Sequence, residues 1–150
     1  KADFARAAGC HHPITRSEQS FVDVVREVTD GEGCAVVYEA IGKDTLQHSL
    51  DSLRPMGVCA AYGHVSGPPD PIDIIQDLGR RGSLFITRPA IMHYVAKRAD
   101  LEWTARDLFK AIGDGLLEAN INYEYALKDA VKAHEAIESG KTLDATVLIP

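Results

Sequence analysis

Hydrophobic positions along the chain follow two patterns that alternate. Apolar residues at helical spacing, each set closed by glycine, proline or polar residues, predict helices near residues 4–8, 21–28, 46–53, 74–78, 101–112 and 130–137. Short, almost wholly apolar runs predict strands at residues 34–38, 58–62, 83–87 and 145–149. We expect Ser17 and Asp100 to cap the second and fifth helices, strand 34–38 to be covered on both faces, and strand 58–62 to be buried as well.

The order of these patterns predicts an α/β fold. Strands that alternate with helices through short connections are typical of a parallel sheet with right-handed crossovers. Residues 66–71 contain three prolines and are expected to form an irregular loop, and residues 123–127 to be an extended approach to the last helix. In open sheets of this kind ligands bind at the carboxyl ends of the strands, here residues 39–42, 62–64 and 85–88.

Two of these strand ends finish in glycine, at Gly42 and Gly63. A glycine at such a place either lets a ligand approach the backbone closely or only turns the chain, and the pattern leaves both readings open. His64 has two readings as well. Its ring either faces the ligand crevice or hydrogen-bonds within its own loop.

Composition narrows the classes of function. The 150 residues, 45% of them hydrophobic and 25% charged, are typical of one globular domain in water. A net charge of −6 argues against nucleic-acid binding, and no apolar run reaches the ~20 residues of a membrane span. Three single cysteines favour reduced thiols and a cytoplasmic location.

Motifs with a chemistry of their own are missing. No strand is followed by Gly-x-Gly-x-x-Gly, and neither a P-loop nor a Gly-x-Ser-x-Gly elbow is present. His11 and His12 are adjacent, and neighbouring side chains of an extended segment point to opposite sides, so we expect no metal site there. Cys34 and Cys59 fall in strand patterns, where a thiol acts as a small apolar side chain. No catalytic residue and no metal ligand is therefore assigned.

Five segments carry a resemblance to a known family: residues 37–45 (VYEAIGKDT), 49–57 (SLDSLRPMG), 62–67 (YGHVSG), 82–89 (GSLFITRP) and the ending from 125–130 (YALKDA) to 147–150 (VLIP). In this order they resemble the zinc-free NADPH:quinone oxidoreductases, the zeta-crystallin-like branch of the medium-chain dehydrogenase/reductase superfamily. The resemblance covers essentially the whole chain.

The resemblance implies that the chain is the C-terminal part of a longer enzyme. Its fold would be a Rossmann-like, doubly wound parallel sheet that lacks its first strand and glycine-rich turn. Residues 1–142 would form a partial NADPH-binding domain, and residues 143–150 a strand that returns to a missing catalytic domain. For that reason we expect strand 145–149 to fray or to pair with another copy of the chain.

The resemblance also implies a cofactor site. Lys1 would contact the 2′-phosphate of NADPH, together with Arg16, where relatives commonly carry an aromatic residue or histidine. An arginine that reaches the cofactor in some relatives is replaced here by Gly140. The nicotinamide and ribose would lie against Ile41, Gly42, Tyr62, Gly63, His64, Phe85, Ile86 and Thr87.

The activity that this resemblance implies is hydride transfer from NADPH to a quinone-like acceptor. The alternatives are a reductase of enoyl or enone substrates and, for the isolated chain, a binding or dimerisation module without turnover. The isolated chain lacks the phosphate-holding turn, so we expect it to fold but to be inactive. A homodimer through the cofactor domain, with strand 83–87 at the edge, is the expected assembly.

Overall fold

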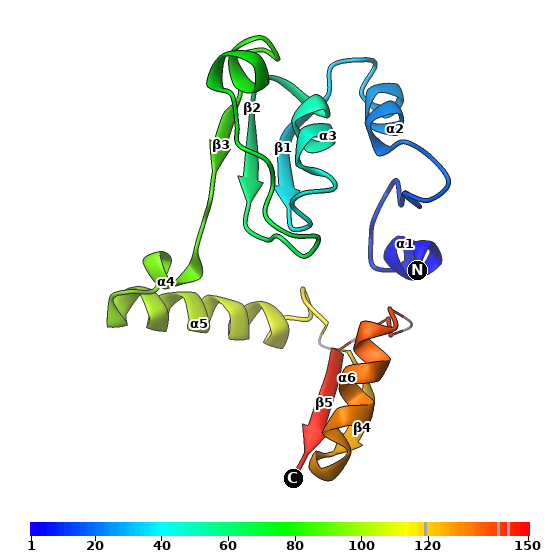
Figure 1. Ribbon diagram of the computed structural model, residues 1–150. Coiled ribbons are helices and arrows are strands. Elements are labelled where there is room, and N and C mark those ends of the chain that lie inside the picture. Colours follow the sequence, from blue (N-terminus) through cyan, green and yellow to red (C-terminus); the bar gives the residue numbers. More distant parts are fainter. Residues whose placement is uncertain (119, 141, 144) are drawn as a thin grey trace. The chain divides into compact units, whose positions relative to one another are not determined.

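The computed structural model describes residues 1–118, 120–140, 142–143 and 145–150. The chain divides into two compact units (Figure 1). One comprises His12–Tyr94, and the other comprises Lys1–His11 together with Val95–Pro150. Each unit is described by itself below.

A three-stranded parallel sheet forms the centre of the His12–Tyr94 unit (Figure 1). Its strands β1 (Cys34–Glu39), β2 (Leu53–Ala61) and β3 (Phe85–Thr87) lie in the order β1-β2-β3. Val37 is paired with Cys59, and Cys59 with Ile86, so the three predicted strands share one register across the sheet. The prediction of an α/β fold with parallel strands is confirmed.

Only one face of this sheet is well covered. Helix α3 (Leu46–Asp51) contributes Leu46 and Leu50 to a buried cluster, which also contains Leu53, Cys59 and Leu84. Side chains alternate between the two faces of a strand, and those on the opposite face remain exposed: Val36 by 44%, Tyr38 by 76% and Phe85 by 59%. The expectation that strand 34–38 is covered on both faces is therefore wrong for this unit.

The ends of two helices in this unit differ from the predicted ends. Helix α2 (Phe21–Val28) is capped by Ser20, whose Oγ accepts a hydrogen bond from the Asp23 N–H, so the prediction of Ser17 as the cap is wrong. Ser20 stands directly before the first helical residue, where a cap side chain reaches that N–H. Helix α3 ends at Asp51, and Leu53 already belongs to β2. Leu53 has the helical spacing of Leu46 and Leu50, but it enters the same core from a strand.

Strand β2 contains Pro55 and Gly57 because its first half is irregular. Cys34 pairs with Leu53 while Val36 pairs with Val58, so several residues of β2 bulge between these two pairs. Met56 there has a φ of 58°, and its N–H donates to the carbonyl of Gly82. A bulge accommodates a proline that a regular ladder would exclude.

Two arginines fix the helices of this unit to the sheet. Arg26 on α2 donates to four backbone carbonyls, those of Gly31, Glu32, Asp51 and Leu53, at 2.6–3.3 Å. Arg81 pairs with Asp51 and Asp77, which joins α3 to the π-helix η1 (Ile74–Gly79). The predicted helix near residues 74–78 is this π-helix, and the unit ends with α4 (Ile91–Tyr94).

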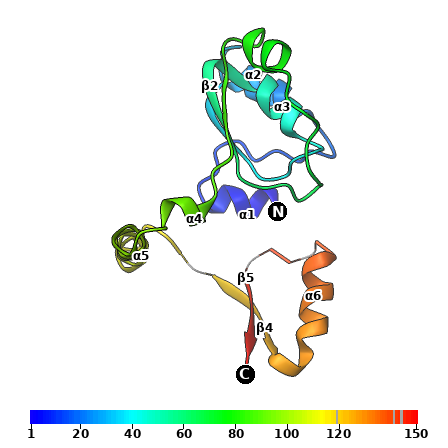
Figure 2. The same cartoon turned by 60° about the vertical axis from the view of Figure 1, so that its left-hand side comes forward.

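The second unit contains α1 (Ala2–Ala7), α5 (Arg98–Gly113), β4 (Ile121–Ala126), the 3₁₀ helix η2 (Leu127–Asp129), α6 (Ala130–Glu138) and β5 (Ala145–Ile149). Helix α6 runs alongside the parallel pair β4–β5 and connects its two strands (Figure 2). Residues 121–126 are therefore a strand where only an extended approach was expected. Asp100 lies in the first turn of α5, which starts two residues earlier, so the prediction that Asp100 is its cap is wrong.

Strand β5 has the predicted bounds but not the predicted partner. Tyr125 pairs with Leu148 and Ala126 with Ile149, so β5 is held by β4 of the same chain. The expectation that it frays or pairs with another copy is wrong. The predicted boundary between residues 142 and 143 stays a prediction, and Lys141 and Asp144 beside it lie outside the described residues. None of the helices in the described part of the chain is long and apolar enough to cross a membrane.

Candidate functional site

The loops that follow β1 and β2 are bound to each other at the carboxyl ends of the strands. Tyr62 N–H and Gly63 N–H both donate to the carbonyl of Glu39, at 2.9 and 3.2 Å. Ser66 binds the carbonyl of Ile41 twice, through its N–H and through its hydroxyl, each at 2.8 Å. We call residues 39–45, 61–67 and 87–88 the carboxyl edge. It contains six of the predicted nicotinamide contacts: Ile41, Gly42, Tyr62, Gly63, His64 and Thr87.

The buried side chain of Glu39 holds the loop that follows β1 in place. Its side chain is buried, and its carboxylate accepts hydrogen bonds from the backbone N–H of Ile41 (2.6 Å) and Gly42 (3.0 Å). The hydroxyls of Thr45 and Ser49 donate to the same carboxylate. Burial alone would raise the pKa of Glu39, but these hydrogen bonds together outweigh burial and lower the pKa below its ordinary value. Glu39 is therefore an ionised anchor that fixes the turn from β1 into α3.

Two glycines of the carboxyl edge, Gly42 and Gly63, are required by contacts between protein segments. A Cβ added at Gly63 would stand 2.3 Å from the carbonyl oxygen of Ala40. A Cβ added at Gly42, where φ is +93°, would stand 2.6 Å from the carbonyl oxygen of Gly67. The space that a side chain would fill is thus already occupied by the neighbouring loop. Gly42 and Gly63 thus permit close packing between two loops, which differs from both readings of the sequence, and close approach of a ligand at these glycines stays a prediction.

Arg88 connects the end of β3 to the end of β2. Its Nη1 donates to the carbonyl of Ala61 at 2.8 Å, and its Nη2 lies 3.2 Å from Nδ1 of His64. Both side chains are exposed. The His64 ring is therefore hydrogen-bonded to Arg88 beyond the end of β3 and not within its own loop, so that reading is wrong, and its place in a ligand crevice stays a prediction.

The three predicted contacts on β3 do not share one environment. Ile86 packs against the buried cluster on the α3 side of the sheet, whereas Phe85 and Thr87 point to the exposed face. Thr87 and Arg88 line a hollow of about 270 Å³ together with Pro89, Ala90, His93 and Tyr94. Tyr62 is also exposed, by 51%. The side chain of Ile86 thus has a role in the core, and a contact of this residue with the cofactor stays a prediction.

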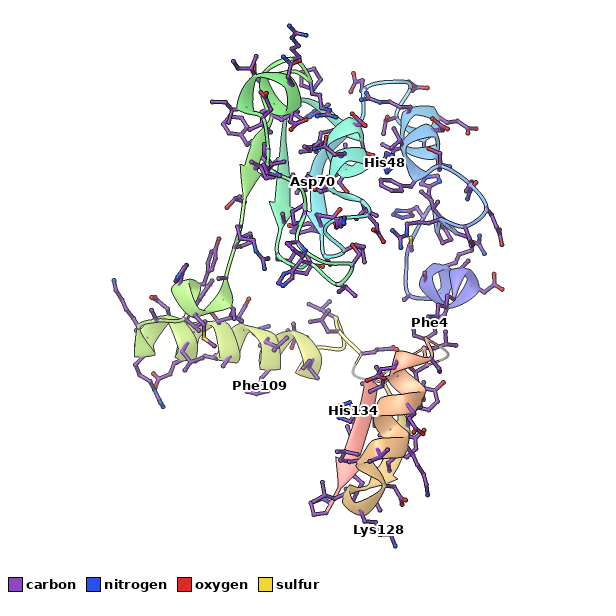
Figure 3. All side chains as sticks on the ribbon, in the orientation of Figure 1. Phe4, His48, Asp70, Phe109, Lys128 and His134 are labelled. Carbon is purple, nitrogen blue, oxygen red and sulfur yellow. The ribbon has the colours of Figure 1, made fainter. Side chains whose placement is uncertain are left out.

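Arg16 lines two neighbouring hollows beside β1. One has a volume of about 310 Å³ and is bordered by Ser20, Asp44 and His48, and the other has about 420 Å³ and reaches Tyr38 and Ile41. His48 stands on α3 on the side that faces α2 (Figure 3), and its ring meets the ring of Phe21 edge to face. In the part of the chain that the structure describes, no side chain forms an ion pair with Arg16, so its charge is available to an anion.

Lys1 belongs to the other unit, where it precedes α1 and is exposed. Its predicted role beside Arg16 stays a prediction. Gly140 follows α6 in the same unit, at a φ of 67°.

The thiols and the histidine pair form no metal centre. Cys59 is fully buried, and burial, with a smaller contribution from the charge of Glu39, raises the pKa of its thiol to about 11. Cys34 is half-buried and Cys10 is exposed. Among the described residues, no three His, Cys, Asp or Glu side chains gather so that they could hold a metal ion. The described residues therefore do not fit a zinc centre.

Two residues of the carboxyl edge were not singled out from the sequence. Glu39 ends an apolar strand and is followed three residues later by a glycine, and Arg88 directly follows β3. A charged residue at the carboxyl end of a buried strand is the signal that would have identified both. Their partners, which lie up to 27 residues away in the sequence, could not be identified in that way.

Comparisons with known proteins relate the chain to oxidoreductases. Residues 8–144 match the family model described as zinc-binding dehydrogenase. A 2-haloacrylate reductase from a Burkholderia species is 51% identical over the whole chain, and a quinone oxidoreductase from Salmonella typhimurium is 39% identical. The chain spans 45% and 46% of these two relatives, about half of their length.

A solved structure shows that the similarity to oxidoreductases extends to the fold. The crystal structure of Escherichia coli quinone oxidoreductase complexed with NADPH superposes on 99% of the chain with a TM-score of 0.92 and 34% identity. The match covers 46% of that protein. The predicted Rossmann-like cofactor fold is confirmed by this match.

Proposed function

The chain belongs to the zinc-binding dehydrogenase family, and on that premise we propose that it is the C-terminal, cofactor-binding part of a longer NADPH-dependent reductase. The family resemblance of its motifs and the coverage of about half of each relative support this division. We call the longer protein the parent protein. NADPH would supply the hydride, and the residues of this chain would bind and orient it.

The observation that carries this proposal is the carboxyl edge. Backbone hydrogen bonds join the loop that carries Ile41 and Gly42 to the loop that carries Tyr62, Gly63 and His64, so five expected contacts of the nicotinamide and ribose lie on two connected loops. Ligands of open parallel sheets bind at this edge. The buried Glu39 carboxylate holds the backbone of the first loop, which keeps Ile41 and Gly42 in place without touching the ligand.

The adenosine end of NADPH would be bound by Arg16 and Lys1. Arg16 has no ion-pair partner among the described residues and lies beside two hollows, and its planar guanidinium suits a phosphate monoester. The sequence contains no Gly-x-Gly-x-x-Gly turn for the pyrophosphate, so that part of the site would come from the rest of the parent protein. For this reason the isolated chain should bind NADPH weakly and should be inactive.

Two classes of electron acceptor are candidates. A quinone is the first, supported by the motifs of residues 37–45 and 82–89 and by quinone oxidoreductase relatives. An alkene activated by a carbonyl group is the second, and the 51% identity to a 2-haloacrylate reductase supports it. A homodimer through the outer edge of β3 remains part of this proposal.

The test is NADPH oxidation by the parent protein with a panel of acceptors. Benzoquinone, an enone and 2-chloroacrylate should be compared at equal concentrations, with NADH in place of NADPH as the control for cofactor preference. We expect turnover with at least one acceptor and a preference for NADPH. Failure of all three acceptors would overturn the proposed function, and the ratio of their kcat/KM values would assign the acceptor class.

A further inference from the structure

The contact between Arg88 and His64 determines which nitrogen of the imidazole carries a proton. Nη2 of Arg88 lies 3.2 Å from Nδ1 of His64. A guanidinium has only donors, so Nδ1 must accept this hydrogen bond. In a neutral imidazole the remaining proton is then on Nε2, because the hydrogen bond made by one nitrogen fixes the state of the other.

We propose that Arg88 is a positioning residue that holds His64 in this tautomer, and that the Nε2–H of His64 donates a hydrogen bond to a carbonyl oxygen of the bound reactants. This inference deepens the proposed function and rests on it. It assigns to the carboxyl edge a hydrogen-bond donor with a fixed orientation, a feature that neither the family match nor the fold specifies.

The backbone around His64 is well suited to hold a donor in place. Gly63 is pressed against Ala40, and the position of a Cβ on Gly42 would lie only 2.9 Å from Cα of His64. The imidazole therefore starts beside Gly42, another expected nicotinamide contact. Arg88 is itself fixed by the carbonyl of Ala61, so the guanidinium has two anchors on the end of β2 and its neighbouring loop. The ring is exposed, which leaves Nε2 accessible to a ligand.

The chemistry requires such a donor. When hydride bonds to the electrophilic carbon of a conjugated carbonyl compound, the electron pair of the carbon–carbon double bond moves towards the carbonyl carbon and negative charge develops on the oxygen. An N–H aimed at that oxygen stabilises the charge as it forms. His64 gives up no proton in this step, and water supplies the proton that the product takes up. The carboxamide of the nicotinamide also has a carbonyl oxygen that can accept this hydrogen bond. The kinetic constants described below distinguish that oxygen from the carbonyl oxygen of the electron acceptor.

The test uses five variants of the parent protein: His64→Gln, His64→Phe, Arg88→Met, the double variant Arg88→Met/His64→Gln, and the control Arg98→Met. His64→Phe should lower kcat by roughly 10- to 100-fold, as for loss of one donor to a developing oxyanion. His64→Gln should keep most of the activity, because an amide N–H replaces the donor and needs no tautomer to be fixed. Among the described residues, Arg98 forms an ion pair with the exposed Glu102 on α5 and lies outside the carboxyl edge, so Arg98→Met should leave kcat unchanged.

The double variant separates positioning from a merely structural role. Arg88→Met should lower kcat by about tenfold when His64 is present, but by less than about twofold in the His64→Gln background, because interacting residues are not additive. An equal loss in both backgrounds would overturn the proposal. If the oxygen belongs to the electron acceptor, kcat falls while the KM for NADPH is kept; if it belongs to the nicotinamide carboxamide, the KM for NADPH rises.

A second measurement does not depend on turnover. In parent protein with ¹⁵N-labelled histidine, NMR correlation of the His64 ring should place its proton on Nε2 in the wild type, and Arg88→Met should produce a mixture of tautomers. A proton on Nδ1 in the wild type would overturn the proposal. If the wild type reduces no acceptor, the proposed function fails, but this spectrum still decides the assignment of the tautomer.

Discussion

Gly63 and Ala40 approach so closely that a Cβ on Gly63 would stand 2.3 Å from the carbonyl oxygen of Ala40. This contact joins the loops after β1 and β2, and those loops carry five of the expected cofactor contacts. The oxygen is part of the backbone, so it cannot move away as the end of a flexible side chain can. The close approach by itself explains why a glycine is needed here.

The first prediction is that Gly63→Ala separates these loops. We expect the parent protein to lose about 1–3 kcal/mol of unfolding free energy, as for other overpacked sites, and to bind NADPH more weakly. Urea denaturation and a fluorescence titration with NADPH measure the two effects. Gly113→Ala at the end of α5 is the control, because a Cβ there has no neighbour within 4 Å. Equal stability of the two variants would contradict the prediction.

A second prediction concerns acid stability and Glu39. Its pKa is lower in the folded chain than its ordinary value of 4.5, so the unfolded chain binds more protons in acid. The stabilisation is therefore complete above pH 4.5 and is lost as the pH falls through the lower pKa of the folded state. Glu39→Gln should destabilise the protein by about 1–3 kcal/mol at neutral pH, since a buried hydrogen-bond network is disrupted, and should reduce the loss of stability in acid.

The control for that measurement is Glu27→Gln on α2. Glu27 is exposed, so its replacement should leave the stability of the protein at neutral pH and its decline in acid as in the wild type. Denaturation curves collected between neutral pH and pH 3 compare the three proteins. If Glu39→Gln retains the acid dependence of the wild type, the assignment of Glu39 as an ionised anchor is wrong.

A third prediction concerns Arg26, which binds four backbone carbonyls of the turn after α2, the end of α3 and the start of β2. Arg26→Met keeps much of the apolar stem but leaves the carbonyls of Asp51 and Leu53 without this donor. We expect a loss of about 1–3 kcal/mol, the cost of unsatisfied buried groups. Arg6→Met removes an exposed pair with Asp3 and should cost less than about 1 kcal/mol. Thermal unfolding of the two variants makes the comparison, and similar losses would contradict the role of Arg26.

Several parts of the fold could be predicted from the sequence because one local pattern was sufficient. The pairing segment of β2 and the whole of β5 are short apolar runs, and Gly9 and Gly113 mark helix ends. The start of β2 at Leu53 could not be predicted in this way, because Leu53 has helical spacing after Leu50. Its position depends on pairing with Cys34, which is distant in the sequence.

The candidate site also contains residues that could be predicted from a local pattern and contacts that could not. Ile41, Gly42, Tyr62 and His64 lie at strand ends, and parallel topology is enough to bring such residues to one edge. Ile86 was predicted as a cofactor contact together with Phe85 and Thr87, but only its side chain packs against the core, because residues alternate between the faces of β3. The links from Arg88 to Ala61 and from Glu39 to Ser49 depend on side-chain reach across the folded sheet, which no local pattern contains.

A fourth prediction addresses cofactor preference. In the parent protein, replacing both Lys1 and Arg16 by alanine should weaken NADPH binding at least tenfold, since each charge-assisted hydrogen bond is worth about 1.5–3 kcal/mol. NADH has no 2′-phosphate, so its dissociation constant should stay nearly unchanged. Titration of both nucleotides into wild type and variant provides the comparison. Equal losses for the two cofactors would show that these residues do not bind the phosphate.

The central claim is that this chain orients NADPH for hydride transfer within the parent protein. Single-turnover oxidation of bound NADPH, followed by the absorbance of the reduced nicotinamide after addition of benzoquinone, an enone or 2-chloroacrylate, tests it most directly. We expect oxidation that requires both the parent protein and an acceptor, and that becomes slower when C4 of the nicotinamide carries deuterium. NADPH that stays reduced with all three acceptors would contradict the account.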